Sequence, residues 1–153
     1  MAIIFDANRK IFTIHTKHTT YQMQADAKGY LLHLYYGVRV KGTMDYLLCY
    51  ADHGFSGNPY AAGMDRTYSL DALPQEYPSL GTGDCRNIAL NITSAVGTEC
   101  CDPIFNSYKI TKGKYSLQGL PAVWAADDEA ETLEIVLKDD LTQVEIHLLY
   151  GVL

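Results

Sequence analysis

Apolar and polar side chains alternate with a period of two residues over much of the chain. Residues 21–25 follow this alternation, and residues 87–92 repeat it. The pattern predicts half-buried β-strands, because successive side chains of a strand point to opposite faces of its sheet. Two further alternating segments, residues 132–138 and 144–150, flank the turn-forming pair Asp139-Asp140 and predict a β-hairpin.

Residues 30–36 are apolar on both faces except at His33, which predicts a central strand covered on both sides. Local helix is expected only at residues 127–130. Many short strands separated by turns are typical of an all-β protein, and we expect a large antiparallel β-sandwich. Further short strands are predicted at residues 3–5, 11–16, 108–111 and 115–117.

Residues 65–86 combine ionisable, aromatic and turn-forming side chains without a strand or helix period. Disordered segments are poor in aromatic residues, so this segment is predicted to be a long ordered loop region. Loops of this kind usually form a binding site or an interface. The ionisable residues of the segment are Asp65, Arg66, Asp71, Glu76, Asp84 and Arg86.

Length and composition fit one soluble domain over residues 1–153, of which 48% are apolar. The formal net charge of −6 argues against a nucleic-acid partner, since phosphate binding draws on clustered Lys and Arg. The N-terminal sequence lacks the pattern of a secretory signal, and no run of 18 apolar residues predicts a membrane span. We therefore expect a cytoplasmic protein.

The four cysteines are predicted to be reduced thiols. Two of them are adjacent, no pair has C-x-x-C spacing, and no secretion signal accompanies them. The histidines lack ligand-like offsets, so no metal and no cofactor is expected. The residues considered are Cys49, Cys85, Cys100 and Cys101, and His15, His18, His33, His53 and His147.

Several short motifs resemble the N-terminal domain of the family 36 glycoside hydrolases, the bacterial α-galactosidases. The chain reads SLDALPQEYP over residues 69–78 and GTGDCR over residues 81–86, close to two motifs of that family. Other similar motifs keep the family order from about Tyr21 to the last residue. They are TYQM at 20–23, GYLLHLYYG at 29–37, ITKGK at 110–114, GLPA at 119–122 and TLEIVL at 132–137.

The resemblance implies a large antiparallel β-sandwich, or supersandwich, that precedes a catalytic (β/α)8 barrel in a retaining α-galactosidase. A chain of 153 residues is too short for this domain plus a barrel, so we expect the barrel to be absent from it. Both catalytic carboxylates of the family lie on that barrel, so the chain alone is expected to be inactive. The implied partners are the enzyme's own barrel, further copies in a homo-oligomer and α-galactoside oligosaccharides.

The carboxylates of the loop region are interpreted as structural. Asp65-Arg66 and Asp84-x-Arg86 place a cation beside an acid, which lowers a carboxylate pKa and suits salt bridging better than acid catalysis. From the resemblance, Glu76 and Tyr77 are expected to anchor the loop against the barrel or a neighbouring subunit. Cys85 is expected to fill a pocket where the family usually has an aromatic ring.

Asp52 is the one candidate for substrate contact. Residues 52–59, DHGFSGNP, resemble a loop that reaches the galactose in a neighbouring subunit's barrel in tetrameric members of the family. His53 departs from the arginine that is common there. A carboxylate can accept two sugar hydroxyl hydrogen bonds at once. The alternative is that Asp52 only caps the turn at Gly54.

A free-standing carbohydrate-binding or oligomerisation module is the other function considered, because the chain has 12 tyrosines and one tryptophan. Most tyrosines fall at strand positions, where a core role is the default. Trp124 follows the GLPA motif on a predicted loop and is the best candidate for an exposed platform.

Overall fold

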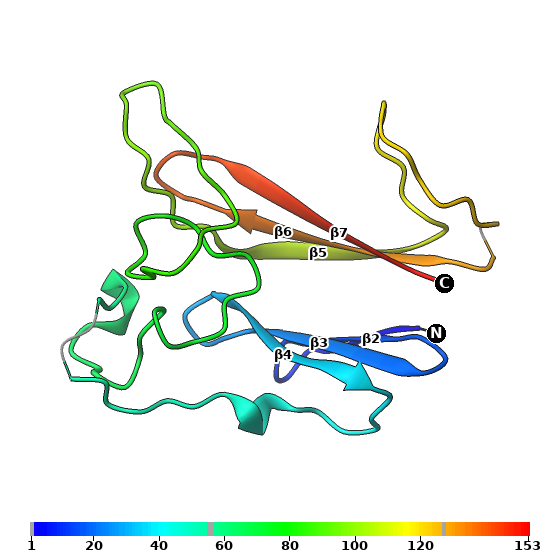
Figure 1. Cartoon of the computed structure of the whole chain (residues 1–153), viewed down its shortest axis with the longest axis horizontal. Coiled ribbons are helices and arrows are strands. Elements are labelled where there is room, and N and C mark those ends of the chain that lie inside the picture. Colours follow the sequence, from blue (N-terminus) through cyan, green and yellow to red (C-terminus); the bar gives the residue numbers. More distant parts are fainter. Residues whose placement is uncertain (1, 55–56, 127) are drawn as a thin grey trace.

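The computed structural model describes residues 2–54, 57–126 and 128–153. It is an antiparallel β-sandwich with two separate layers, which Figure 1 shows from the side. The first sheet has the strand order β1-β2-β3-β4 and the second has the order β5-β6-β7. The strands of the first sheet are β1 Ile3–Asp6, β2 Ile11–His15, β3 Thr19–Ala25 and β4 Leu31–Val38. Those of the second are β5 Ile104–Lys112, β6 Glu131–Lys138 and β7 Glu145–Val152.

The main core lies between the two sheets. An aromatic cluster joins the layers, since the Phe12 ring of β2 lies 5.2 Å from the Tyr108 ring of β5, and Phe5 of β1 lies 4.3 Å from Tyr108. Apolar side chains at alternate positions of the strands fill the rest. The buried members are Ile3, Phe12, Ile14, Met23, Ala25, Leu31, Leu133, Ile135, Leu137 and Val152.

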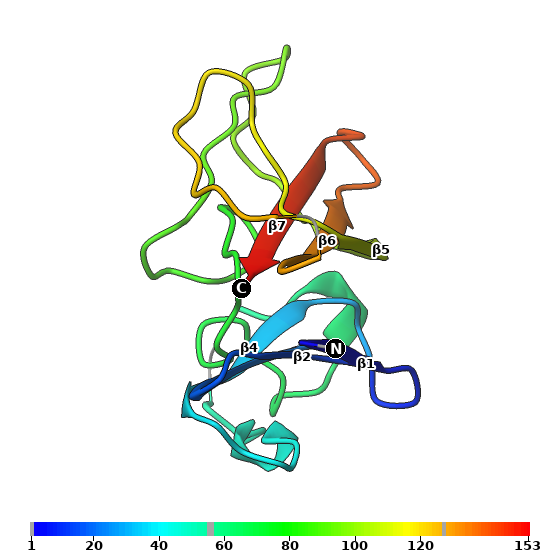
Figure 2. The same cartoon turned by 90° about the vertical axis from the view of Figure 1, so that its right-hand side faces the viewer.

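The predicted hairpin is confirmed as β6 and β7, which pair from Glu131–Val152 to Lys138–Glu145. The turn begins after Lys138, where the Asp139 amide donates to the Val144 carbonyl at 3.0 Å. The alternation at residues 132–138 predicts this strand correctly, because one face of the hairpin packs on the first sheet. Figure 2 shows this hairpin above β4.

The prediction of a central strand at residues 30–36 is wrong in one respect. β4 is buried on both faces near its start but stands at the edge of its sheet. Leu31 packs into the core between the sheets, whereas Leu32 packs into a second core formed by the long loop. The loop, and not another strand, therefore explains the apolar residues on the second face.

Three local predictions are also wrong. Residues 87–92 keep their alternating burial but form only one bridge, from Leu90 to Ser79, because no neighbouring strand is available. Residues 115–117 are not a strand. Asp127 lies outside the described residues, and residues 128–129 form a turn instead of a helix.

Two single-turn 3-10 helices were not predicted. They are η1 Asp45–Leu47 and η2 Tyr60–Ala62, both within the connection from β4 to β5. One turn is too short to produce a visible helical period in the sequence.

The core between the sheets generates the first testable prediction. Leu133→Ala should lower the free energy of unfolding by about 2–5 kcal/mol, because Leu133 is 0% exposed and its removal leaves a cavity. Leu141→Ala is the matched control, since Leu141 is 92% exposed, and it should change stability by less than about 0.5 kcal/mol. Urea unfolding of both variants tests this, and equal effects would contradict the placement of the core.

Candidate functional site

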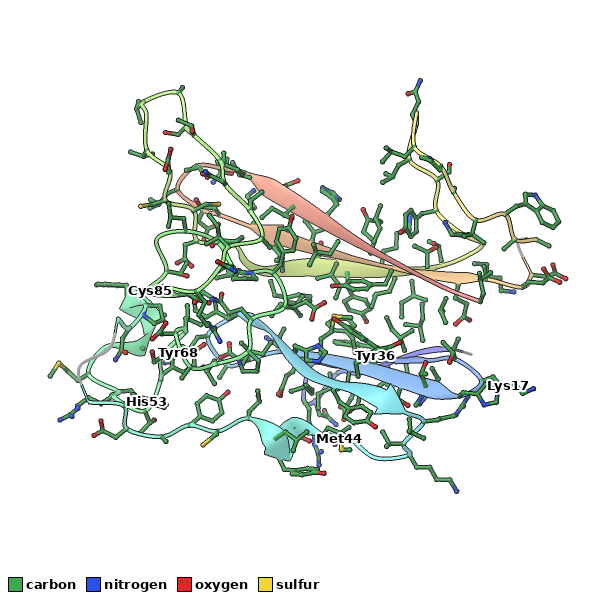
Figure 3. The ribbon with its side chains drawn as sticks, in the orientation of Figure 1. Lys17, Tyr36, Met44, His53, Tyr68 and Cys85 are labelled. Atoms are coloured by element: carbon green, nitrogen blue, oxygen red, sulfur yellow. The ribbon has the colours of Figure 1, made fainter. Side chains whose placement is uncertain are left out.

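The loop region is longer than predicted, since the whole connection from β4 to β5, residues 39–103, belongs to it and residues 65–86 are one part. It covers the edge and one face of the first sheet (Figure 1). It has its own buried core, separate from the core between the sheets. Figure 3 places Tyr68 of this core beside the end of the first sheet, with His53 and Cys85 further out. The buried residues of the loop core are Tyr30, Leu32, Ala62, Tyr68, Leu70 and Leu73.

Asp26 joins the loop core to the turn between β3 and β4. Its carboxylate accepts the Tyr68 hydroxyl and the backbone amides of Lys28 and Tyr30, each amide at 2.9 Å. Burial and then the hydrogen bond to Asp26 raise the pKa of Tyr68 well above its usual value, so this phenol remains a donor. Lys28 also donates from Nζ to the Ala61 carbonyl at 2.9 Å.

Asp84 and Arg86 form an ion pair within the loop. Arg86 Nε and Nη2 donate to the two carboxylate oxygens of Asp84 at 2.9 and 2.8 Å, a bidentate pair. Nη2 also donates to the carbonyls of Leu70 and Leu73, and Gln75 Nε2 donates to Asp84 at 2.9 Å. The hydrogen bond from Arg86 is the main cause that lowers the pKa of Asp84. This pair ties residues 70–75 to residues 84–86.

Glu76 lies between the two sheets. Its Oε1 accepts the hydroxyls of Tyr21 of β3 and Tyr150 of β7, the latter at 2.8 Å, and Oε2 lies 3.3 Å from His33 Nδ1 of β4. Burial is the largest cause that raises the pKa of both tyrosines, and Glu76 adds to it. Tyr77 is half-buried against the core between the sheets. Both residues thus anchor the loop to the strands of its own domain.

Asp52 remains accessible at the outer end of the loop region, with its side chain 52% exposed. Its Oδ1 accepts the Gly54 amide at 2.7 Å, which is the expected turn cap, and lies 3.1 Å from Arg66 Nη2. Asp52, and not Asp65, is therefore the ion-pair partner of Arg66 among the described residues. Asp65 accepts instead from Thr67 Oγ1 at 2.6 Å, and this bond is the largest cause that lowers the pKa of Asp65.

A close backbone approach brings the Asp52 segment against the segment of Asp84. A Cβ placed on Gly83 would lie 2.7 Å from the Gly57 carbonyl oxygen, and Gly83 has a φ of +92°. Only glycine tolerates both this close contact and the positive φ at position 83. Phe55 and Ser56, which belong to the motif around Asp52, lie outside the described residues.

The predicted site residues therefore divide into two groups. Asp84, Arg86, Glu76 and Tyr77 contact the interior of the domain. Asp52, Asp65 and Arg66 lie at the surface, where Asp52 pairs with Arg66. Sequence reasoning missed Asp26 and its partner Tyr68 of the loop. It also missed the two tyrosine partners of Glu76, which are Tyr21 of β3 and Tyr150 of β7. A single sequence offers no signal for such pairs, because the partners are 42 to 74 residues apart.

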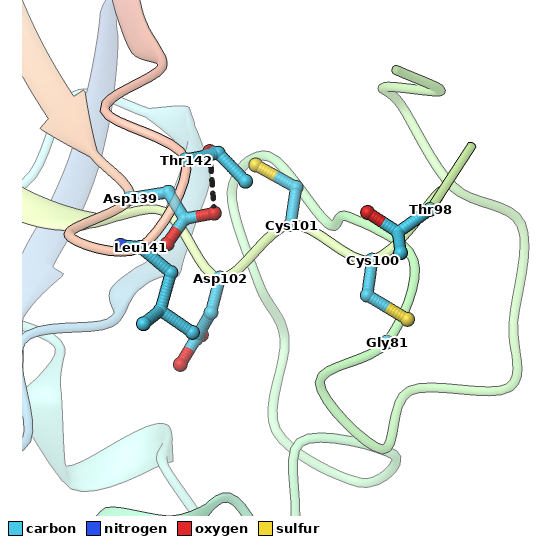
Figure 4. A pocket seen from close by; sticks show the side chains of 8 residues that line it. All are labelled: Gly81, Thr98, Cys100, Cys101, Asp102, Asp139, Leu141 and Thr142. Carbon is cyan, nitrogen blue, oxygen red and sulfur yellow. Dashed lines mark hydrogen bonds between the residues drawn. The ribbon is translucent and has the colours of Figure 1, made fainter. Parts of the chain in front are cut away.

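All four cysteines are free. Cys85 is exposed, which contradicts our expectation that it fills a pocket occupied by an aromatic ring in the family. Cys101 is buried beside a cavity of about 390 Å³, and burial raises the pKa of its thiol to about 11. Figure 4 shows that the thiols of Cys100 and Cys101 point in different directions, toward Gly81 and Thr142 respectively.

Neither a metal centre nor a membrane span is found in the part of the chain that the structure describes. No cluster of three or more His, Cys, Asp or Glu side chains is arranged to hold a metal ion there. No described helix has the length and apolar character needed to cross a bilayer.

Comparison with known proteins identifies the domain. The profile of the glycosyl hydrolase family 36 N-terminal domain matches residues 29–153. The chain belongs to this family. It is 72% identical, over 100% of its length, to a bifunctional α-galactosidase/sucrose kinase of Mediterraneibacter gnavus, and 40% identical, over 98%, to α-galactosidase Mel36A of Lactobacillus acidophilus.

Solved structures of the same family give the same fold. The galactosidase domain of the α-galactosidase-sucrose kinase AgaSK superimposes with a TM-score of 0.97 over 99% of this chain and 21% of that one. The α-galactosidase AgaB of Geobacillus stearothermophilus superimposes with a TM-score of 0.88 at 40% identity, over 99% of this chain and 20% of that one. The chain spans only 16% and 21% of the two curated relatives named above.

The second prediction concerns the ion pair of Asp84. Asp84→Asn should lower the free energy of unfolding at pH 7 by about 1.5–3 kcal/mol, because it removes charge-assisted hydrogen bonds from the buried carboxylate, whereas Arg86 is 46% exposed and stays solvated. The folded-state pKa of Asp84 lies below its unfolded value, so its contribution is present above the unfolded value and is lost as pH falls through the folded one. Urea unfolding at pH 7 and pH 3 should show the difference from wild type shrinking in acid. The exposed carboxylate variant Glu99→Gln is the control, and an equal loss there would contradict the assignment.

The third prediction concerns the thiols. In the native protein at pH 8, Cys101 should react with iodoacetamide roughly a hundredfold more slowly than Cys49, Cys85 and Cys100, because it is buried and its thiolate fraction is lower. Peptide mass spectrometry gives the four rates. After denaturation without reductant all four should be alkylated, and two or fewer modified cysteines would contradict the free thiols.

Proposed function

We propose that this chain is the non-catalytic N-terminal domain of an α-galactosidase that hydrolyses terminal α-galactosides of oligosaccharides. Its relatives are α-galactosidases, and related enzymes have been solved in complex with raffinose and with stachyose. Because the chain spans about a fifth of the α-galactosidases that it matches, the catalytic barrel would lie in the remaining polypeptide.

The engagement of the loop carboxylates is the observation that carries this proposal. Asp84 is buried in a bidentate pair, and Glu76 is held by two phenols and an imidazole. A retaining glycosidase needs two carboxyl groups about 5–5.5 Å apart that reach the sugar. Carboxylates that accept hydrogen bonds from within the domain are better suited to a structural role than to catalysis. The domain would therefore support the barrel and the assembly of a homo-oligomer.

Asp52 is the residue proposed to act on substrate, from one subunit into the pocket of a neighbour. Its carboxylate is half exposed while Gly54 and Arg66 fix its orientation, so it is held ready for a ligand at the outer end of the loop. There it would accept hydrogen bonds from galactose hydroxyls. The turn cap at Gly54 is compatible with this role, because a carboxylate has about four acceptor sites.

A free-standing carbohydrate-binding or oligomerisation module is the second candidate, favoured by the 85% exposure of Trp124. Calorimetric titration of residues 1–153 with raffinose separates the two, since a module binds the sugar without a barrel. We also propose a cytoplasmic location, to which the free cysteines lend support.

The fourth prediction tests Asp52 in the full-length enzyme. Asp52→Ala should reduce kcat/KM for an α-galactoside by roughly 10- to 150-fold, because a charge-assisted hydrogen bond contributes about 1.5–3 kcal/mol. Asp52→Asn retains an oxygen for the Gly54 amide, so it separates substrate contact from turn capping. Asp140→Ala, at the exposed turn between β6 and β7, is the control and should leave kcat/KM unchanged.

Subunit mass by sedimentation velocity must accompany these kinetics. Full activity in Asp52→Asn would reduce the residue to a turn cap. Loss of activity only together with loss of the oligomer would assign Asp52 to assembly and overturn the substrate role.

A further inference from the structure

The connection from β5 to β6 projects from the end of the second sheet as an arm, which we define as residues 114–126 (Figures 1 and 2). Its base is closed by hydrogen bonds. The Gly113 amide donates to the Ala130 carbonyl at 2.8 Å, and Thr132 Oγ1 donates to the Gly113 carbonyl at 2.8 Å while it accepts the Tyr115 amide at 3.1 Å. Loops of this length with closed ends are commonly functional.

The arm carries apolar side chains into solvent. Residues 115–126 contain no charged residue, although a fifth of the chain is charged. Leu120 is 61% exposed, Val123 64% and Trp124 85%. Grouped exposed apolar side chains of this kind mark an interaction site. An exposed Trp is also the residue type most enriched among the anchors of such sites.

The end of β7 lies against the base of the arm. A Cβ placed on Gly151 would lie 3.2 Å from Cε1 of the Tyr115 ring and 3.6 Å from Cγ of Lys114, so the two segments are in contact. Any polypeptide that continues from Leu153 therefore leaves beside the arm. The relatives are about five times as long as this chain, and the family profile assigns the chain to their N-terminal domain.

We propose that the arm docks, through Leu120, Val123 and Trp124, on the polypeptide that follows Leu153 in the parent protein. The receiving surface is apolar and uncharged, because residues 115–126 of the arm offer it no charge to pair. Trp124 is the central anchor, and the closed base presents it with little loss of conformational entropy on docking. This inference rests on the proposed function in one respect, which is that the parent protein continues beyond this domain.

Photo-crosslinking in the full-length parent tests the docking. Trp124→p-benzoylphenylalanine places a crosslinker on the returning half of the arm, after the turn that the hydrogen bond from Leu120 to Leu117 closes. The protein is assembled from a mixture of ¹⁴N- and ¹⁵N-labelled copies. Leu141→p-benzoylphenylalanine is the matched control, since Leu141 is equally exposed but sits on the turn between β6 and β7. We expect crosslinks from position 124 to residues beyond 153 that carry one isotope only, at about tenfold the yield from position 141.

Each other outcome overturns the docking. Crosslinks that join the two isotopes would assign the arm to a second copy, and equal yields from positions 124 and 141 would mean that exposure alone determines them. No crosslink beyond residue 153, together with protection of Trp124 from oxidation by an oligosaccharide, would assign the arm to carbohydrate binding. Turnover of an aryl α-galactoside by the parent reports on the proposed function separately, because an inactive parent can still give the expected crosslinks.

Discussion

The contact on which the rest of this structure depends is the insertion of Glu76 between the two sheets. One carboxylate accepts the hydroxyl of Tyr21 from the first sheet and that of Tyr150 from the second, and His33 lies beside its other oxygen. A buried carboxylate without donors would be strongly unfavourable, so the loop can place Glu76 here only when both sheets are in register. The same residue therefore fixes the loop to the sandwich and one sheet to the other.

Further contacts hold the rest of the loop in place on either side of Glu76. Beside Glu76, the backbone of Pro74 and Gln75 pairs with the outer edge of β4, which would otherwise present unpaired amides and carbonyls. The Asp84–Arg86 pair then holds the next turn against Leu70 and Leu73. At the far end, Gly83 lies against Gly57, close in sequence to the exposed Asp52.

How much of this the sequence predicts depends on how local the cause is. The β6–β7 hairpin follows from alternation and a turn, both of which lie within about 20 residues. The pairing of Asp84 with Arg86 is equally local, and it was predicted. The edge position of β4 and the partners of Asp26 and Glu76 were not, because they depend on which distant segments meet. Residues 87–92 alternate locally but do not form a strand, because a segment with this pattern also needs a neighbouring strand to pair with.

β4 contributes side chains to two cores, because Leu31 packs into the sandwich core and Leu32 packs into the loop core. The loop core consists largely of residues 62–73 packed on one strand face, and none of its buried residues belongs to the sandwich core. From this arrangement we expect two cooperative units of different stability. Amide exchange in the loop would then reflect a partial opening, while exchange in β2, β3 and β6 would require the whole domain to unfold. The surface that carries Asp52 thus belongs to the unit that can rearrange on its own.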